Sequence, residues 1–169
     1  RGENMPWYTG RTMLEFLEEV HIASDRNFID FRFPVQSVLR PNLNFRGYQG
    51  TIASGVIRVG DEVIALPSGK KSVVKEIVTW DGHQDEAFPP QAVTMTLEDE
   101  LDISRGDILA RPNNVPRVER RFEAMVVWMH EQPLREGRNY RIKLGTQSIP
   151  GEVVSVRYRV GVNTLKKGT

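Results

Sequence analysis

Apolar and polar residues alternate through much of residues 31–69, and glycines interrupt the pattern. Phe31, Phe33 and Val35 alternate with an arginine, a proline and a glutamine, and this period of two is typical of a strand with one buried face. Pro34 has no N–H to donate, so we expect its strand to lie at a sheet edge or to begin its ladder there. The stretch predicts the first strands of a closed antiparallel β-barrel.

The same signals continue to residue 111 and predict six strands, enough to close a small barrel and remove its edges. The expected strands are 31–36, 48–53, 62–66, 72–80, 92–97 and 108–111. A polar loop is expected between Asp81-Gly82 and Pro89-Pro90, and the acidic residues of 98–102 are expected to form a solvated connection. Two prolines and two asparagines in residues 111–116 predict a domain boundary.

A short amphipathic helix is predicted over residues 12–19. Thr12 followed by Glu15 has the spacing of a capping box, and apolar residues then recur at helical intervals. The apolar face needs a cover that the preceding residues do not supply, so we expect the helix to close a domain whose main body is absent from this sequence. Residues 24–29 would be the linker into the barrel.

Residues 113–169 predict a second, incomplete β unit with strands at 120–130, 140–144 and 152–162. Three strands cannot close a barrel, and open edges favour disorder or pairing with another copy of the chain. The expected division is therefore a remnant and linker over 1–24, a barrel over 25–112 and a partial barrel over 113–169. The chain looks like a piece of a longer polypeptide.

The net charge of +1 hides an uneven distribution. Residues 1–24 hold two basic against four acidic residues, residues 25–112 hold ten against thirteen, and residues 113–169 hold eleven against five. The last excess, eleven minus five, would suit an acidic partner or nucleic acid. We favour a solvated face, because no aromatic residues are interleaved with the basic ones in a binding motif.

No motif for catalysis or for phosphate binding emerges. Residues 67–72 superficially suggest a phosphate loop, but Ile64 stands where its first glycine belongs and Lys71 precedes Ser72, so we expect a hairpin turn. The tripeptide Arg105-Gly106-Asp107 is also interpreted as a turn. No serine-glycine elbow or histidine cluster predicts a nucleophile. We therefore predict no catalytic and no cofactor-binding residue in the chain.

Two further residue sets have simple structural interpretations. His83 beside Asp85 and Glu86 is the one place where metal-ligand types gather, and we interpret it as a flexible loop without a metal. Trp7, Trp80 and Trp128 are expected to be core residues rather than platforms for bases, as isolated aromatics in apolar patterns usually are.

The composition is that of an ordinary soluble protein, with 39% hydrophobic and 27% charged residues. No apolar run is long enough to span a bilayer, and no signal peptide opens the sequence. The absence of cysteine agrees with a reducing compartment. These features predict a cytoplasmic protein without a membrane partner.

Several motifs resemble those of translation-factor GTPases. MPWYTG and TMLE at residues 5–10 and 12–15 resemble the end of the GTPase domain. GTIASG, VGDEV and DISRGD at residues 50–55, 59–63 and 102–107 resemble the second domain of elongation factor Tu and its relatives. FPVQ, RPNLNFRGY, VWM and QPL at residues 33–36, 40–48, 127–129 and 132–134 are similar to the large, GTP-binding subunits of bacterial sulfate adenylyltransferases.

This resemblance covers nearly the whole chain and implies an all-β fold, a domain II barrel followed by part of a domain III barrel. In that family the large subunit hydrolyses GTP and drives a small catalytic subunit, which makes adenylyl sulfate from ATP and sulfate. The phosphate loop, switch segments and guanine-reading motif of the family have no counterpart here. The resemblance therefore implies that GTP and Mg²⁺ belong to an attached GTPase domain.

Three functions remain open at this point. The first is a non-catalytic portion of the sulfate-activating subunit, docking its GTPase domain and its small catalytic partner. The second is an RNA- or tRNA-binding barrel of a translation factor, for which the basic last third would supply the charge. The third is a structural spacer in a bifunctional enzyme.

Overall fold

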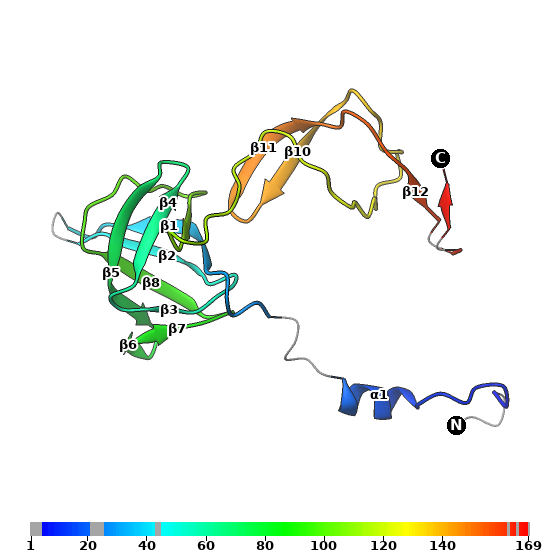
Figure 1. Ribbon diagram of the computed structural model, residues 1–169, viewed down its shortest axis with the longest axis horizontal. Coiled ribbons are helices and arrows are strands. Elements are labelled where there is room, and N and C mark those ends of the chain that lie inside the picture. The colour runs from blue at the N-terminus through cyan, green and yellow to red at the C-terminus, as the bar shows by residue number, and fades with distance from the viewer. Residues whose placement is uncertain (1–4, 21–25, 43–44, 162, 165, 169) are drawn as a thin grey trace.

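The computed structural model describes residues 5–20, 26–42, 45–161, 163–164 and 166–168 (Figure 1). These residues form one helix and thirteen strands, so the predicted all-β class is confirmed. The helix is α1 (Met13–Glu19). The strands are β1 (Arg32–Leu39), β2 (Gly47–Thr51), β3 (Ile57–Arg58), β4 (Glu62–Leu66), β5 (Lys70–Thr79), β6 (Gly82–Gln84), β7 (Glu86–Ala87), β8 (Ala92–Leu97), β9 (Ile108–Ala110), β10 (Asn139–Leu144), β11 (Gln147–Glu152), β12 (Arg159–Val160) and β13 (Lys167–Gly168).

Six strands close an antiparallel barrel, as the sequence predicts. They pair in the order β4-β9-β1-β2-β8-β5, and β5 returns to pair with β4. All six correspond to expected strands, with ends that differ by at most three residues. Closure leaves none of the six with an unpaired edge, which removes the usual template for aggregation.

The position of β1 corrects part of the expectation for Pro34. β1 is not an edge strand, because it pairs with β9 on one side and with β2 on the other. The ladder with β9 ends at Pro34, opposite Ile108, and the ladder with β2 begins at the next residue, Val35. A proline is tolerated inside the closed barrel because it stands where β1 changes partners.

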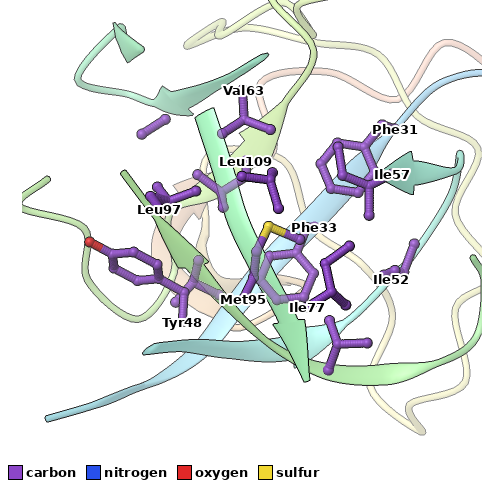
Figure 2. Close-up of a cluster of buried hydrophobic side chains, with 14 of the residues drawn as sticks. Phe31, Phe33, Tyr48, Ile52, Ile57, Val63, Ile77, Met95, Leu97 and Leu109 are labelled. Carbon is purple, nitrogen blue, oxygen red and sulfur yellow. The ribbon is translucent and has the colours of Figure 1, made fainter. Parts of the chain in front are cut away.

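The barrel interior is filled by the inward residues of these strands (Figure 2). Phe33, Ile77 and Met95, from β1, β5 and β8, are fully buried and point toward one another. Tyr48 is also buried, but its hydroxyl points out of the cluster. Fully burying each aliphatic or aromatic side chain of this kind stabilises a fold by about 1.5–3 kcal/mol, so the barrel has an adequate core of its own.

Within residues 32–110, three short strands do not follow from the sequence pattern. β6 and β7 lie within the segment predicted to be a polar loop, and β3 pairs with β7. Each has only two or three residues, too few for a periodic pattern to be visible. The acidic connection 98–102 holds no strand, as expected, although Leu101 within it is buried.

The last third departs most from prediction. Residues 120–130 form no strand, so that expectation is wrong, whereas β10 confirms the strand expected at 140–144. The strand predicted at 152–162 is also wrong for most of its length: β11 ends at Glu152 and β12 covers only Arg159–Val160, while residue 162 lies outside the described residues. None of the described residues after 112 is buried, so the basis for a second core is lacking here.

The N-terminal helix matches its prediction. Thr12 is the N-cap, its hydroxyl accepts from the Glu15 N–H at 3.2 Å, and the Glu15 carboxylate accepts from the Thr12 N–H at 2.7 Å. No residue of α1 is buried, and its apolar side chains are exposed. The expected linker 24–29 is described only from Arg26, since residues 21–25 lie outside the described residues.

Candidate functional surfaces

The residues examined for chemistry are held in turns and strands. Pro67-Ser68-Gly69 joins β4 to β5 in a tight hairpin, where the Gly69 N–H donates to the Ala65 carbonyl at 2.7 Å, and this confirms the predicted turn. Arg105 and Gly106 likewise form the expected turn, closed by a 3.1 Å bond from the Asp107 N–H to the Ser104 carbonyl.

The expected metal-ligand types are dispersed by the fold. His83 lies in β6 and Glu86 in β7, where Glu86 forms an ion pair with Arg58 of β3. Their segment is therefore ordered into strands, contrary to the flexible loop expected. Among the described residues, no group of three or more His, Cys, Asp or Glu side chains is placed to hold a metal ion.

The GTIASG and VGDEV motifs contact the residues where the chain enters and leaves the barrel, Phe31 and Arg111; we call this part the barrel's entry. Gly55 has a φ of +71°, and a Cβ there would lie 2.3 Å from the Phe31 Cα. In the second motif, the Asp61 carboxylate accepts from Arg111 at 2.8 Å and from the Arg58 N–H at 2.9 Å. These motifs hold the scaffold together, and only glycine fits at position 55.

The RPNLNFRGY segment is hydrogen-bonded to the acidic connection of residues 98–102. Arg46 and the Tyr48 hydroxyl both donate to the Leu101 carbonyl, at 2.7 and 2.8 Å. Arg40 approaches Glu100 at 3.5 Å. Burial is the largest influence on the Tyr48 phenol and raises its pKa, so it remains a neutral donor at physiological pH. Residues 43 and 44 of the motif lie outside the described residues.

A set of hydrogen bonds around Asn114, here called the Asn114 strap, joins the residues at the start of β1 to the segment that follows β9. Asn114 accepts from the Arg32 guanidinium at 2.9 Å through its carbonyl and at 2.8 Å through its side-chain oxygen, and its amide donates to Asp30. Hydrogen bonds from Asn27 and then Asn114 hold the pKa of Asp30 below its usual value. The predicted boundary segment 111–116 is thus fastened to the barrel.

The β10–β11 hairpin touches the barrel at its tip. The Thr146 hydroxyl donates to the Val35 carbonyl at 2.8 Å, and Gly145 lies beside Pro34. Next to this contact, Arg105 donates to the Gln36 carbonyl at 2.7 Å. The DISRGD turn and the start of β1 therefore form the surface that contacts the β10–β11 hairpin.

The three tryptophans do not lie in a core, contrary to expectation. Trp7 is 75% exposed, Trp80 99% and Trp128 40%, so none is a core residue. Trp128 packs edge-on against Tyr140, with ring centres 5.4 Å apart, and donates to the Gln132 carbonyl at 2.7 Å. Trp80 has no aromatic neighbour or hydrogen bond through its side chain within the described residues, which leaves it available to a partner.

The last third combines exposed apolar and basic side chains. Phe122, Met125, Val127 and Met129 are each at least 65% exposed. Arginines occur on both sides of this segment, and in the described part of this region they form one ion pair, between Arg157 and Glu123. A surface of this composition suits a macromolecular partner rather than a small molecule.

No helix among the described residues has the length and hydrophobicity needed to cross a membrane.

The features most accessible to a partner do not follow from the sequence pattern. The exposure of Trp80 follows from its place in a turn, which the apolar run of 72–80 concealed. The strap at Asn114 follows from no motif, because its partners lie 82 and 84 residues away in sequence.

The comparisons with known proteins concern the whole chain. Residues 121–169 match the family model described as GTP-eEF1A C-terminal domain-like. The chain is 59% identical over 167 residues to "Bifunctional enzyme CysN/CysC" of Rhodopirellula baltica, and 58% identical over 166 residues to "Sulfate adenylyltransferase subunit 1" of Bacteroides fragilis. These alignments cover 99% and 98% of the chain but only 26% and 35% of the relatives, so the chain spans about a third of their length or less.

Solved structures share the fold at low sequence identity. Translation elongation factor SelB from Methanococcus maripaludis matches with a TM-score of 0.68 at 22% identity, over 82% of this chain and 30% of that one. Sup35 complexed with GMPPNP matches with a TM-score of 0.67 at 17% identity, over 96% and 40%. These likenesses establish the translation-factor type of β-barrel architecture.

Proposed function

We propose that this chain, which is homologous over nearly its full length to part of the sulfate adenylyltransferase subunit 1 family, is a docking and coupling portion of such a subunit. In the proposed role it catalyses nothing itself. It joins a GTPase domain, which would bind GTP and Mg²⁺, to a small catalytic subunit that makes adenylyl sulfate from ATP and sulfate. The proposal places the chain in the cytoplasm, with which its lack of cysteine agrees.

The observation that supports this role is that the motif residues make internal contacts that hold the barrel together. Gly55, Asp61 and Arg111 fasten the barrel's entry, while Arg46 and Tyr48 fasten the acidic connection. These residues are engaged in turns and straps, and such a scaffold holds exposed loops at fixed positions. Loops positioned by a rigid scaffold are where binding functions concentrate.

Calorimetric titration of the chain tests the proposal directly. We expect the chain to bind a small subunit of sulfate adenylyltransferase and to give no heat with GTP and Mg²⁺. An equal-sized barrel from a translation factor is the matched control and should not bind that small subunit. Tight guanine-nucleotide binding, or adenylyl sulfate synthesis by the chain alone, would contradict the proposal.

The exposed basic side chains of residues 113–169 favour one second candidate, an RNA- or tRNA-binding barrel. Eleven basic against five acidic residues lie there, and none of those described is buried. Binding of this kind weakens steeply with salt, because it releases counterions from the phosphates. Titration against tRNA at increasing salt distinguishes the two: no association at low ionic strength removes this candidate.

A further inference from the structure

Trp80 is presented at the tip of a short, well-defined hairpin. Thr79 at the end of β5 pairs with Gly82 at the start of β6, so only Trp80 and Asp81 form the turn. The Thr79 hydroxyl accepts from the Asp81 N–H at 3.3 Å and donates to the Gly82 carbonyl at 3.2 Å. The backbone beneath the indole is therefore fixed, although the side chain is 99% exposed.

Trp80 is not exposed because the barrel core is incomplete. β5 pairs with β4 on one side and β8 on the other, within a barrel that is already closed. Ile77 of the same strand is fully buried and belongs to the filled interior. Burying Trp80 thus requires another surface, because the barrel has no place for it.

The hairpin also has a defined charge. Asp81 adjoins Trp80 in the turn, Glu76 and Asp85 lie at the other end of the β5–β6 ladder, and Lys75 is the one lysine or arginine of 75–86. Within the described residues, Asp81 and Asp85 take part in no ion pair, whereas the nearby Glu86 is paired with Arg58. An exposed indole beside uncompensated carboxylates suits a protein pocket that is apolar inside and basic at its rim.

The Trp80 hairpin lies away from the β10–β11 hairpin, which also contacts the barrel. Figure 1 shows β6 on the side of the barrel away from the β10–β11 hairpin, whose tip contacts Val35. The surface around Trp80 is consequently open to a different polypeptide.

Resting on the function proposed above, we infer that the Trp80 hairpin is the part of the barrel that binds the small catalytic subunit. The indole fills an apolar pocket of that subunit and donates its N–H to an oxygen acceptor there. Asp81 and Asp85 face lysine or arginine side chains at the pocket rim. Tryptophan is suited to this role, because it combines a large apolar area with one hydrogen-bond donor and few rotatable bonds.

Binding of the small subunit to variants of the chain tests the inference. Trp80→Ala is expected to weaken binding about 30-fold or more, as the loss of a central tryptophan contact does. Trp80→Phe should recover most of the loss, since it restores the apolar area. Trp7→Ala is the matched control: it removes an exposed tryptophan outside the barrel and should leave affinity unchanged.

Charge supplies an independent measurement. Asp85→Lys is expected to slow association and to flatten its dependence on salt, because it removes an attractive charge at the rim. Far-UV circular dichroism of each variant checks that the barrel is folded. The Trp80 side chain has no partner within the described structure, so its replacement should not alter the fold.

The outcomes separate this inference from the proposed function. If the unaltered chain fails to bind the small subunit, the docking function itself is wrong and the inference falls with it. If the unaltered chain binds and Trp80→Ala binds equally well, the docking function stands and the Trp80 hairpin is overturned as its site. A loss confined to Trp80→Ala and Asp85→Lys supports the inference.

Discussion

Replacing Gly55 with alanine tests the packing at the barrel's entry. The residue has a φ of +71°, and the added Cβ would lie 2.3 Å from both the Cα and the N of Phe31. Its N–H donates to the Asn27 carbonyl at 2.7 Å, so the loop cannot move away without breaking that bond. Both the conformation and the space at this position exclude a side chain.

The expected cost has two parts. Left-handed backbone costs a residue with a Cβ roughly 1–2 kcal/mol relative to glycine. Relieving a contact that is about 1 Å too short requires backbone to shift, and overpacking of this kind costs about 1–3 kcal/mol. Gly55→Ala should therefore destabilise the barrel by about 2–5 kcal/mol. Gly60→Ala isolates the first part, because Gly60 has a φ of +89° and nothing lies within 4 Å of its Cβ position.

Urea denaturation followed by far-UV circular dichroism measures both variants. Tryptophan fluorescence is a poor probe here, because Trp80 and Trp7 are exposed in the folded chain. At a slope of about 2 kcal/mol/M, the unfolding midpoint should fall by about 1–2.5 M for Gly55→Ala and by about 0.5–1 M for Gly60→Ala. Equal shifts for the two variants would refute the close approach of residue 55 to Phe31.

Three further predictions concern other parts of the chain. Tyr48→Phe should destabilise the barrel by about 0.5–1.5 kcal/mol in the same urea assay, because it removes one hydrogen bond to Leu101. Since the folded-state pKa of Asp30 is lowered, its stabilisation is present above about pH 4 and is lost as pH falls through the folded-state pKa. Asp30→Asn should accordingly flatten the acid side of the stability profile, and an unchanged profile would contradict the hydrogen bonds that Asp30 accepts from Asn27 and Asn114. In hydrogen exchange, residues 120–130 should lose protection much faster than β2, because they form no backbone ladder.

The barrel was predictable because each of its six strands satisfies two conditions at once. The period of two places Phe33, Val63 and Leu109 on inner faces, and turn residues separate the runs. Closure then follows from the number of strands. What the pattern did not supply was the partner of each strand, which is why Pro34 was expected at an edge and instead stands where β1 changes partners.

The error at Trp80 has a specific physical cause. Residues 72–80 are rich in valine and isoleucine and predict one strand, but β5 has a register shift between Val74 and Glu76 and ends at Thr79. The shift changes which side chains point inward after it, and the next residue belongs to the turn. An aromatic residue at the end of an apolar run is therefore ambiguous until the register of the strand is known.

The error at residues 120–130 is of a different kind. Val126 and Val127 favour a strand locally, but a strand needs a ladder, and the described residues offer this segment none. In the barrel, by contrast, every expected strand has neighbours within the 80 residues that contain it. Local propensity is a sufficient guide only where a neighbouring strand is present to pair with the segment.

This contrast bears on where the chain binds others. The GTIASG and VGDEV motifs resemble those of translation-factor barrels, yet their residues Gly55 and Asp61 serve internal packing and turns. Residues engaged in this way cannot also contact a partner without giving up the bonds that hold the barrel. In the proposed docking role, specificity resides in side chains that the scaffold presents but does not use, and Trp80 is the largest such side chain on the closed barrel.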